Sequence, residues 1–389
     1  MLESNNRILA LDVIRGFALF GILIVNMMSF HSPFLYLNPL KWWTDPRDHF
    51  TYIVIDLFFQ ASFYPLFSLL FGYSLTIFRE RTLKKNLPFN RMVTRRFCFL
   101  FIIGFIHAFF IWHGDILMVY ALVGFLTLWF LKMAPKIIFL FGCFLYAIAN
   151  TLFALFLAGL DFIHPNPVGS NGYSKLAQAV VQIYQQGTFA EITGQRVHDW
   201  MMEYNPQALI LLLFTVFPLF LIGAGLSKLR LLEKVEGNEG KWKGSLVWTF
   251  LFGMLFKLLP YFAGNSRAVD YLQDVFGGSL QAVSYASMIV ILLRKKRAAR
   301  FLVFFSFAGK MSLSTYLLQS SLAVLVFYGY GLQLFGKTSL FSGSLLALGL
   351  FVFQAMFSIF WMRRHDYGPV EWLWRCITYL KVPRWKKTS

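Results

Sequence analysis

The stretch ILALDVIRGFALFGILIVNMMSFH, residues 8–31, decides the fold class of this chain. About 20 apolar residues in a helix are enough to cross the hydrocarbon core of a bilayer. The stretch is that long, yet it carries Asp12, Arg15 and Asn26. A charge inside a membrane helix costs roughly 2.5 to 3.5 kcal/mol, so such charges need a partner or a function.

Asp12 and Arg15 are three residues apart, which places them in contact on one face of the predicted helix. Two interpretations follow: a neutralised pair that holds this helix against its neighbours, or a polar site in which Arg15, supported by Asp12, binds an anionic group. Asn26 lies eleven residues beyond Arg15 and therefore falls near the same face at the other end. His31 follows at the helix end.

The composition extends the membrane assignment to the whole chain. Of 389 residues, 58% are hydrophobic and only 14% are charged, whereas a soluble domain has about 25% charged residues. The net charge is +18, and 26 of the 36 Lys and Arg residues lie in segments predicted to be cytoplasmic, against 6 in predicted outer segments. This is the positive-inside pattern, so the basicity does not indicate a nucleic-acid partner.

Hydropathy predicts an all-α polytopic membrane protein with about ten transmembrane helices in one integral membrane domain, residues 1–389, and with both termini cytoplasmic. The N-terminus lacks a basic run and a small-residue cleavage site, so we expect the first helix to be retained as a span. The three cysteines lie in or near the cytoplasmic side, and no disulfide is expected. The predicted spans are 8–29, 50–78, 97–112, 116–131, 137–160, 207–226, 245–262, 277–293, 311–330 and 342–362.

Three segments between or after these spans have a predicted role. The loop 161–206 is predicted to be extracytoplasmic, with amphipathic interfacial helices that form a possible lid. The basic run 294–300 is expected to contact anionic lipid headgroups or to steer an anionic ligand. The tail 363–389 is predicted to be cytoplasmic and interfacial, because it is amphipathic and rich in tryptophan.

The second span contains Asp56 and Gln60, four residues apart on one face, and then Pro65, which predicts a kink. Lys257 near the outer end of the seventh span is expected only to reach toward the interface. Asp56 is either a structural hydrogen-bond acceptor or a member of an outer polar site. We expect Asn26 and Gln60 in that outer site.

The third and fourth spans are joined by the short connection His113-Gly114-Asp115, for which a left-handed Gly114 is predicted. His107 lies about two turns before it and is either a satisfied core residue or a catalytic one. His113 and Asp115 are candidates for the rim of the outer site, and Asp115 is also placed to cap the fourth helix. We see no metal-ligand spacing, phosphate-binding glycine loop or nucleophile elbow.

The chain contains, in order, the four motifs LDVIRGFALFGILIVN (11–26), GFIHAFFIWHGDIL (104–117), GKMSLSTYLLQS (309–320) and YGPVEWLWR (367–375). Together they resemble the YeiB family of bacterial membrane proteins, which is classified as a domain of unknown function. The resemblance extends over the whole chain and implies a multi-pass protein of the bacterial cell membrane.

The first two spans also resemble, more distantly, the transmembrane acyltransferase superfamily. The resemblance rests on the D-x-x-R-G pattern at Asp12, Arg15 and Gly16 and on Val25-Asn26. It rests also on a histidine after the first helix, similar in position to His31, and on an aspartate in the second span, similar to Asp56. It implies transfer of an acyl group from cytosolic acyl-CoA, the only cofactor expected, to an extracytoplasmic acceptor.

In that interpretation Arg15 meets a phosphate of the donor, and a histidine activates the acceptor beside a carboxylate. The predicted catalytic residues are Asp56 with His31 or His107. Two other interpretations remain open: a transporter or flippase in which the intramembrane charges form a path, and a non-catalytic membrane partner or sensor that docks through 161–206.

Overall fold

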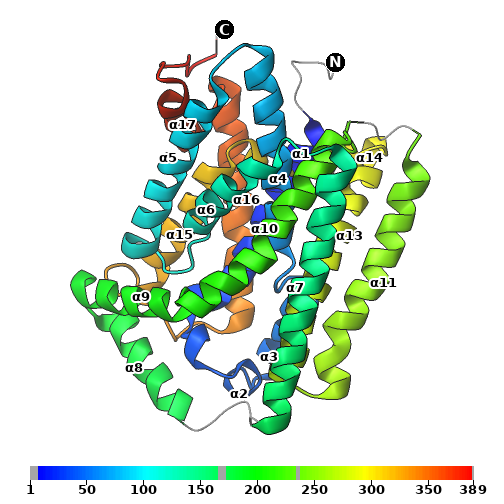
Figure 1. Cartoon of the computed structure of the whole chain (residues 1–389). Coiled ribbons are helices and arrows are strands. Elements are labelled where there is room, and N and C mark those ends of the chain that lie inside the picture. Colours follow the sequence, from blue (N-terminus) through cyan, green and yellow to red (C-terminus); the bar gives the residue numbers. More distant parts are fainter. Residues whose placement is uncertain (1–7, 165–171, 234–236, 388–389) are drawn as a thin grey trace.

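The computed structural model describes residues 8–164, 172–233 and 237–387, and these residues form helices without any strand (Figure 1). Each of the ten predicted spans coincides with a helical segment. By length and composition, eight segments are able to cross a membrane, a bent helix pair makes a ninth, and α6 (Leu117–Phe130) is a shorter apolar helix. Within the described ranges the chain is therefore an all-α, multi-pass membrane protein.

The bundle has two ends of different character. The first turn of α1 (Leu9–His31) and the whole of α17 (Pro369–Tyr379) lie at one end, which we call the basic end (Figure 1). At the opposite end α8 (Gly172–Gln186) and α9 (Phe189–Glu203) lie across the membrane helices, and we call it the loop end. These two helices lie in the loop 161–206, for which amphipathic helices were predicted.

Helix α1 (Leu9–His31) is the centre of the bundle. Its most apolar window is 56% buried by the rest of the protein, against 17% for α11 (Glu239–Ala263), whose surface is left for lipid. It packs on α14 (Lys296–Lys310) through Gly16 and Gly309, since a Cβ at either glycine would overlap the backbone of the other helix. Small residues permit such close contact between membrane helices.

The remaining spans surround this centre. They are α4 (Phe63–Lys84), α5 (Phe89–Phe110), α7 (Pro135–Ile163), α10 (Pro206–Lys228), α13 (Gly278–Leu292), α15 (Ser312–Phe327) and α16 (Leu340–Arg364). Shorter elements are η1 (Phe34–Tyr36), α2 (Pro39–Trp42), α3 (Pro46–Phe58) and α12 (Arg267–Leu272).

The helices are interrupted at three places, one inside the second predicted span and two at the starts of predicted spans. The second span stops at Phe58 and restarts at Phe63, with Ala61 at a positive φ of 53°. The kink predicted at Pro65 thus lies a turn earlier than expected, because a proline ring clashes with the carbonyl four residues before it, here that of Ala61. Pro65 itself lies in the first turn of α4, where proline is tolerated.

The other two interruptions are in the second half of the chain. The predicted span 311–330 coincides with α15, and α14, which precedes it, meets it at a bend of 82°. Between α12 and α13, the residues Gln273–Gly277 form a π-helical turn, η2. Short π-helical turns inserted in α-helices occur frequently at functional sites.

Candidate functional site

A cavity of about 610 Å³ runs inside the bundle along α1. Arg15 lines it near the basic end, and Asn26 lines it toward the loop end. These two positions are separated by roughly 16 Å along a helix, at 1.5 Å per residue. The cavity is therefore long enough to connect the two halves of the membrane region.

The basic end of the cavity carries four cationic side chains from four helices: Arg15, Arg96, Lys310 and Arg375. Arg15 is placed by α1, and its guanidinium donates to Asp12 at 3.1 Å and to the Ser74 hydroxyl at 2.9 Å. The contact between Asp12 and Arg15 predicted from their spacing is thus present. Asp12 itself does not line the cavity.

The middle of the cavity is apolar. Its wall is made by side chains of α1, α4, α5, α6 and α10, and these include Leu19, Ile22, Phe67, Leu70, Phe71, Leu100, Leu117 and Leu212. A purely polar ligand would lose its hydration there without replacement. The cavity therefore suits a ligand with a chain of apolar groups between polar ends.

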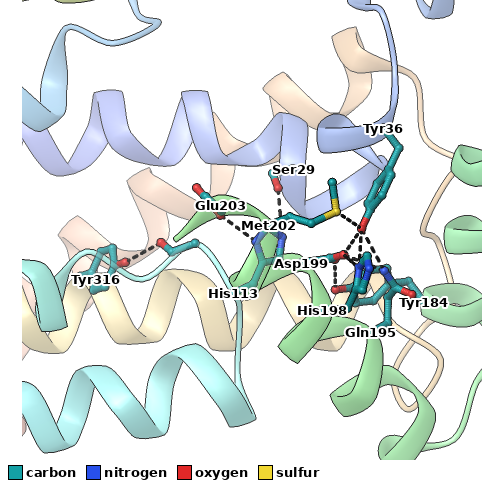
Figure 2. Close-up of polar contacts among 11 residues, drawn as sticks. Ser29, Tyr36, His113, Tyr184, Gln195, His198, Asp199, Met202, Glu203 and Tyr316 are labelled. Carbon is teal, nitrogen blue, oxygen red and sulfur yellow. Dashed lines mark hydrogen bonds and ion pairs between the residues drawn. The ribbon is translucent and has the colours of Figure 1, made fainter. Parts of the chain in front are cut away.

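The loop end of the cavity is polar and partly acidic, with Asn26, Gln60, Glu203 and Asp274 in its wall. Glu203 comes from α9, so the loop-end helices take part in closing the cavity. Its carboxylate accepts a hydrogen bond from Nδ1 of His113 at 3.0 Å, and Nε2 of His113 lies 3.5 Å from the Ser29 hydroxyl (Figure 2). His113 thus supports a carboxylate that faces the cavity.

A buried aspartate connects α9 to α8 and to η1, the short helix that follows α1. Asp199 of α9 accepts hydrogen bonds from the hydroxyls of Tyr36 and Tyr184, both at 2.5 Å, and from the Gln195 amide at 2.6 Å (Figure 2). Burial, and next the bond to Asp199, raise the pKa of Tyr36 well above its usual value. Tyr36 donates this bond to Asp199 and so links η1 to α9.

The structure does not bring the predicted catalytic residues together. Asp56 accepts from the Tyr261 hydroxyl at 2.8 Å and from the Gln273 amide at 2.7 Å, and it forms no hydrogen bond to His31 or His107. His31 is fully buried, and within the described residues neither ring nitrogen has a hydrogen-bond partner. None of these residues lines the cavity.

His107 and Asp115 form a separate buried pair. Nδ1 of His107 lies 2.9 Å from Oδ1 of Asp115, and both side chains are fully buried. The other oxygen of Asp115 accepts from the backbone N–H of Met118 at 3.0 Å, as expected of a residue that caps α6. A structural role is therefore enough to explain His107 and Asp115. The pair also fixes the connection that contains His113, two residues before Asp115.

The left-handed conformation predicted for Gly114 is wrong, because its φ is not positive. Glycine is required there for a different reason: a Cβ would overlap the indole ring of Trp112. The tightness of the connection was therefore predicted correctly, but its cause is side-chain packing.

Sequence reasoning missed Arg96, Arg375, Glu203 and Asp274 as site residues. The first two belong to basic segments that were explained by topology, and Glu203 lies in the loop. Asp274 lies 3.6 Å from the buried ammonium of Lys257, which also donates to the backbone oxygen of Gln60 at 2.7 Å. Lys257 was expected to reach the interface, but its side chain is fully buried.

No group of three His, Cys, Asp or Glu residues in the described part of the chain is arranged to hold a metal ion. The groups able to hold a charged organic ligand are the cations at the basic end of the cavity.

Comparison with known proteins gives a family but no activity. The family model described as "Protein of unknown function (DUF418)" matches residues 226–381. "Uncharacterized protein YxaH" of Bacillus subtilis (strain 168) is 33% identical over 99% of this chain and 98% of its own length. "Uncharacterized protein YeiB" of Escherichia coli (strain K12) is 28% identical over 98% of this chain and 99% of its own.

Proposed function

The chain belongs to the DUF418 family, and we propose that this member is a bacterial plasma-membrane acyltransferase that passes an acyl group from cytosolic acyl-CoA to an extracytoplasmic acceptor. The observation that carries the proposal is the single cavity with cations at one end and a histidine-supported carboxylate at the other. By the positive-inside rule the basic end faces the cytoplasm, where acyl-CoA is found.

In this proposal the phosphates of the donor lie at the basic end and the acyl thioester reaches into the apolar stem. Arginine binds phosphate well because its guanidinium forms paired, charge-assisted hydrogen bonds. The acceptor enters below α9. The apolar wall excludes water and so protects the thioester from hydrolysis.

In the proposed transfer step, Glu203 is the general base. The oxygen or nitrogen of the acceptor forms a bond to the thioester carbonyl carbon, the carbon–sulfur bond breaks, and CoA leaves as a thiolate. The carboxylate of Glu203 takes the proton of the acceptor and returns it to that thiolate. His113 is a positioning residue, because it donates to Glu203 and does not itself line the cavity.

The test uses full-length protein in detergent, palmitoyl-CoA or acetyl-CoA as donor, glucosamine as the acceptor probe, and release of free CoA thiol as the readout. Wild type is expected to release thiol only when the acceptor is present. Glu203→Gln should lower that rate about 100-fold, a typical contribution of a general base. Glu239→Gln, at an exposed glutamate paired with Arg294 and outside the cavity wall, should leave it unchanged.

Thiol release by neither donor from folded wild type would overturn acyl transfer. Equal rates for wild type and Glu203→Gln would overturn the role of Glu203. The affinity for acyl-CoA, measured in parallel, should be the same in Glu203→Gln and wild type, since the carboxylate lies at the other end from the phosphates.

A second candidate, movement of an amphiphile across the membrane, is favoured by the broken helices. All three breaks border the cavity, at Gln60 and Ala61, at Asp274 and Val275, and at Ser312 and Leu313. Transporters commonly form their substrate sites from discontinuous helices. Flux of fluorescent phosphatidylglycerol in reconstituted vesicles, without thiol release, would favour this function.

A further inference from the structure

Two arginines at the basic end have no acidic partner. Arg96 of α5 and Arg375 of α17 both line the cavity, and no carboxylate of the described residues lies within 4.0 Å of either guanidinium. Arg96 lies over the Trp374 ring, 3.6 Å from its centre, and Arg375 lies over the Tyr367 ring at 4.2 Å. The aromatic rings hold the guanidiniums in place without neutralising them.

The acidic groups near these arginines are occupied elsewhere. Glu371 accepts from the backbone N–H groups of Leu313 and Ser314 at 2.7 and 3.1 Å and from the Ser314 hydroxyl at 2.5 Å. Asp12 is bonded to Arg15. The basic end therefore keeps an excess of positive charge next to the opening of an apolar stem.

We infer that this end is a binding site for the phosphate head of an amphiphile, in which Arg96 and Arg375 hold the phosphate and the apolar stem holds the chain. This inference rests on the cavity of the proposed function but not on acyl transfer. In this inference the main phosphate contacts are Arg96 and Arg375, whose charges no carboxylate of the described residues balances. Arg15, whose charge is balanced by Asp12, is not the main contact.

Helix α17 gives this site its shape. Its Trp374 indole donates to the backbone oxygen of Arg96 at 2.8 Å, and its Glu371 is bonded to the first turn of α15. The interfacial helix is thus fixed to two membrane helices and presents Arg375 to the cavity. Acyl-CoA and an anionic phospholipid share the required chemistry, a phosphate ester joined to an apolar chain.

The test measures binding of dodecyl phosphate to the full-length protein in dodecyl maltoside. Saturable binding is expected, with affinity about tenfold lower in Arg96→Gln and in Arg375→Gln, as for loss of one charge-assisted hydrogen bond. The control is Arg363→Gln, at an exposed arginine of the same end that does not line the cavity, and it should bind as wild type does. Dodecyltrimethylammonium should not compete.

Competition separates the two sources of phosphate. Displacement by palmitoyl-CoA but not by phosphatidylglycerol vesicles assigns the site to the thioester donor, and the reverse result assigns it to a lipid. If Arg96→Gln fails to fold, because it loses its stacking on Trp374, Arg375→Gln and Arg96→Lys still decide the matter.

Undiminished binding in Arg375→Gln and in whichever Arg96 variant folds would overturn the inference. Thiol release by wild type with such undiminished binding would leave acyl transfer standing. Conversely, arginine-dependent binding without thiol release would leave only the phosphate site.

Discussion

Arg15 satisfies both interpretations offered for the first helix. It is ion-paired with Asp12 and hydrogen-bonded to Ser74 of α4, and it also lines the cavity. The pair is largely shielded, with 17% of the Arg15 side chain and 4% of the Asp12 side chain exposed. Its contribution to folding is therefore expected to be larger than that of a surface pair.

Asp12→Asn should lower the free energy of unfolding by about 3 kcal/mol, because it leaves the Arg15 charge buried without its carboxylate. Unfolding in mixed micelles of rising sodium dodecyl sulfate content measures this. Asp45→Asn is the control, since the Asp45–Arg47 pair is 54% and 80% exposed and should contribute less than about 1 kcal/mol. A loss for Asp12→Asn no larger than for the control would argue against a structural role of the pair.

His31 was predicted as a catalytic residue, but its surroundings are apolar. It lies between Trp43 and Phe327 with both ring nitrogens unbonded among the described residues. His31→Leu should therefore stabilise the protein by roughly 1 kcal/mol, because an unsatisfied buried polar group is removed. His107→Leu should destabilise it, since Asp115 would lose its partner. Melting temperatures in detergent should move in opposite directions; a stability loss for His31→Leu would point to a partner for His31.

At the scale of elements, the closest packing is between α1 and α14. Gly309→Ala should destabilise the protein by about 2 kcal/mol, because the added methyl group meets the backbone carbonyl of Asp12. Gly349→Ala in α16 is the control: nothing lies near its Cβ, and alanine favours helix there. A neutral Gly309→Ala would mean that the two helices separate without loss.

The elements also show what hydropathy can predict. Apolar length predicted the positions of the helices: each of the ten predicted spans coincides with a helical segment, and eight of these segments are long and apolar enough to cross a membrane. The interruptions at residues 59–62, 273–277 and 311 contain or adjoin the polar residues Gln60, Gln273 and Lys310, but polar residues such as Asn150 and Lys257 also lie inside uninterrupted helices, so hydropathy alone does not distinguish them. Their backbone depends on contacts such as that of Gly278 with the Ala61 carbonyl, which are distant in sequence.

At the scale of the whole molecule, the cavity could not be predicted from the sequence. Arg15 and Asn26 were recognised because they interrupt an apolar helix, and both line it. Arg96, Glu203 and Arg375 lie outside the predicted spans or at their edges, where charges are ordinary. Only the folded chain brings an end of α5, the loop helix α9 and the tail helix α17 to one continuous space.

Because the cavity is continuous, the length of a ligand's apolar chain should affect how tightly the ligand binds. Ile22 lines the middle of the cavity, between the cations and Glu203. Ile22→Trp should fill the stem, so the apolar chain of an amphiphile loses burial at about 0.8 kcal/mol per methylene group, whereas a head group at the basic end loses nothing. If four methylene groups are displaced, the affinity for dodecyl phosphate should fall by roughly 200-fold, and that for inorganic phosphate should stay within about twofold.

Leu122→Trp, at an exposed position of α6, is the matched control and should bind both phosphates as wild type does. An equal loss of both phosphates in Ile22→Trp would mean that the substitution disturbs the basic end as well. If neither affinity changed, the chain would have to leave the cavity between the helices and enter the lipid. In that case the polar loop end, with Glu203 and Asp274, would not meet the ligand bound by the arginines.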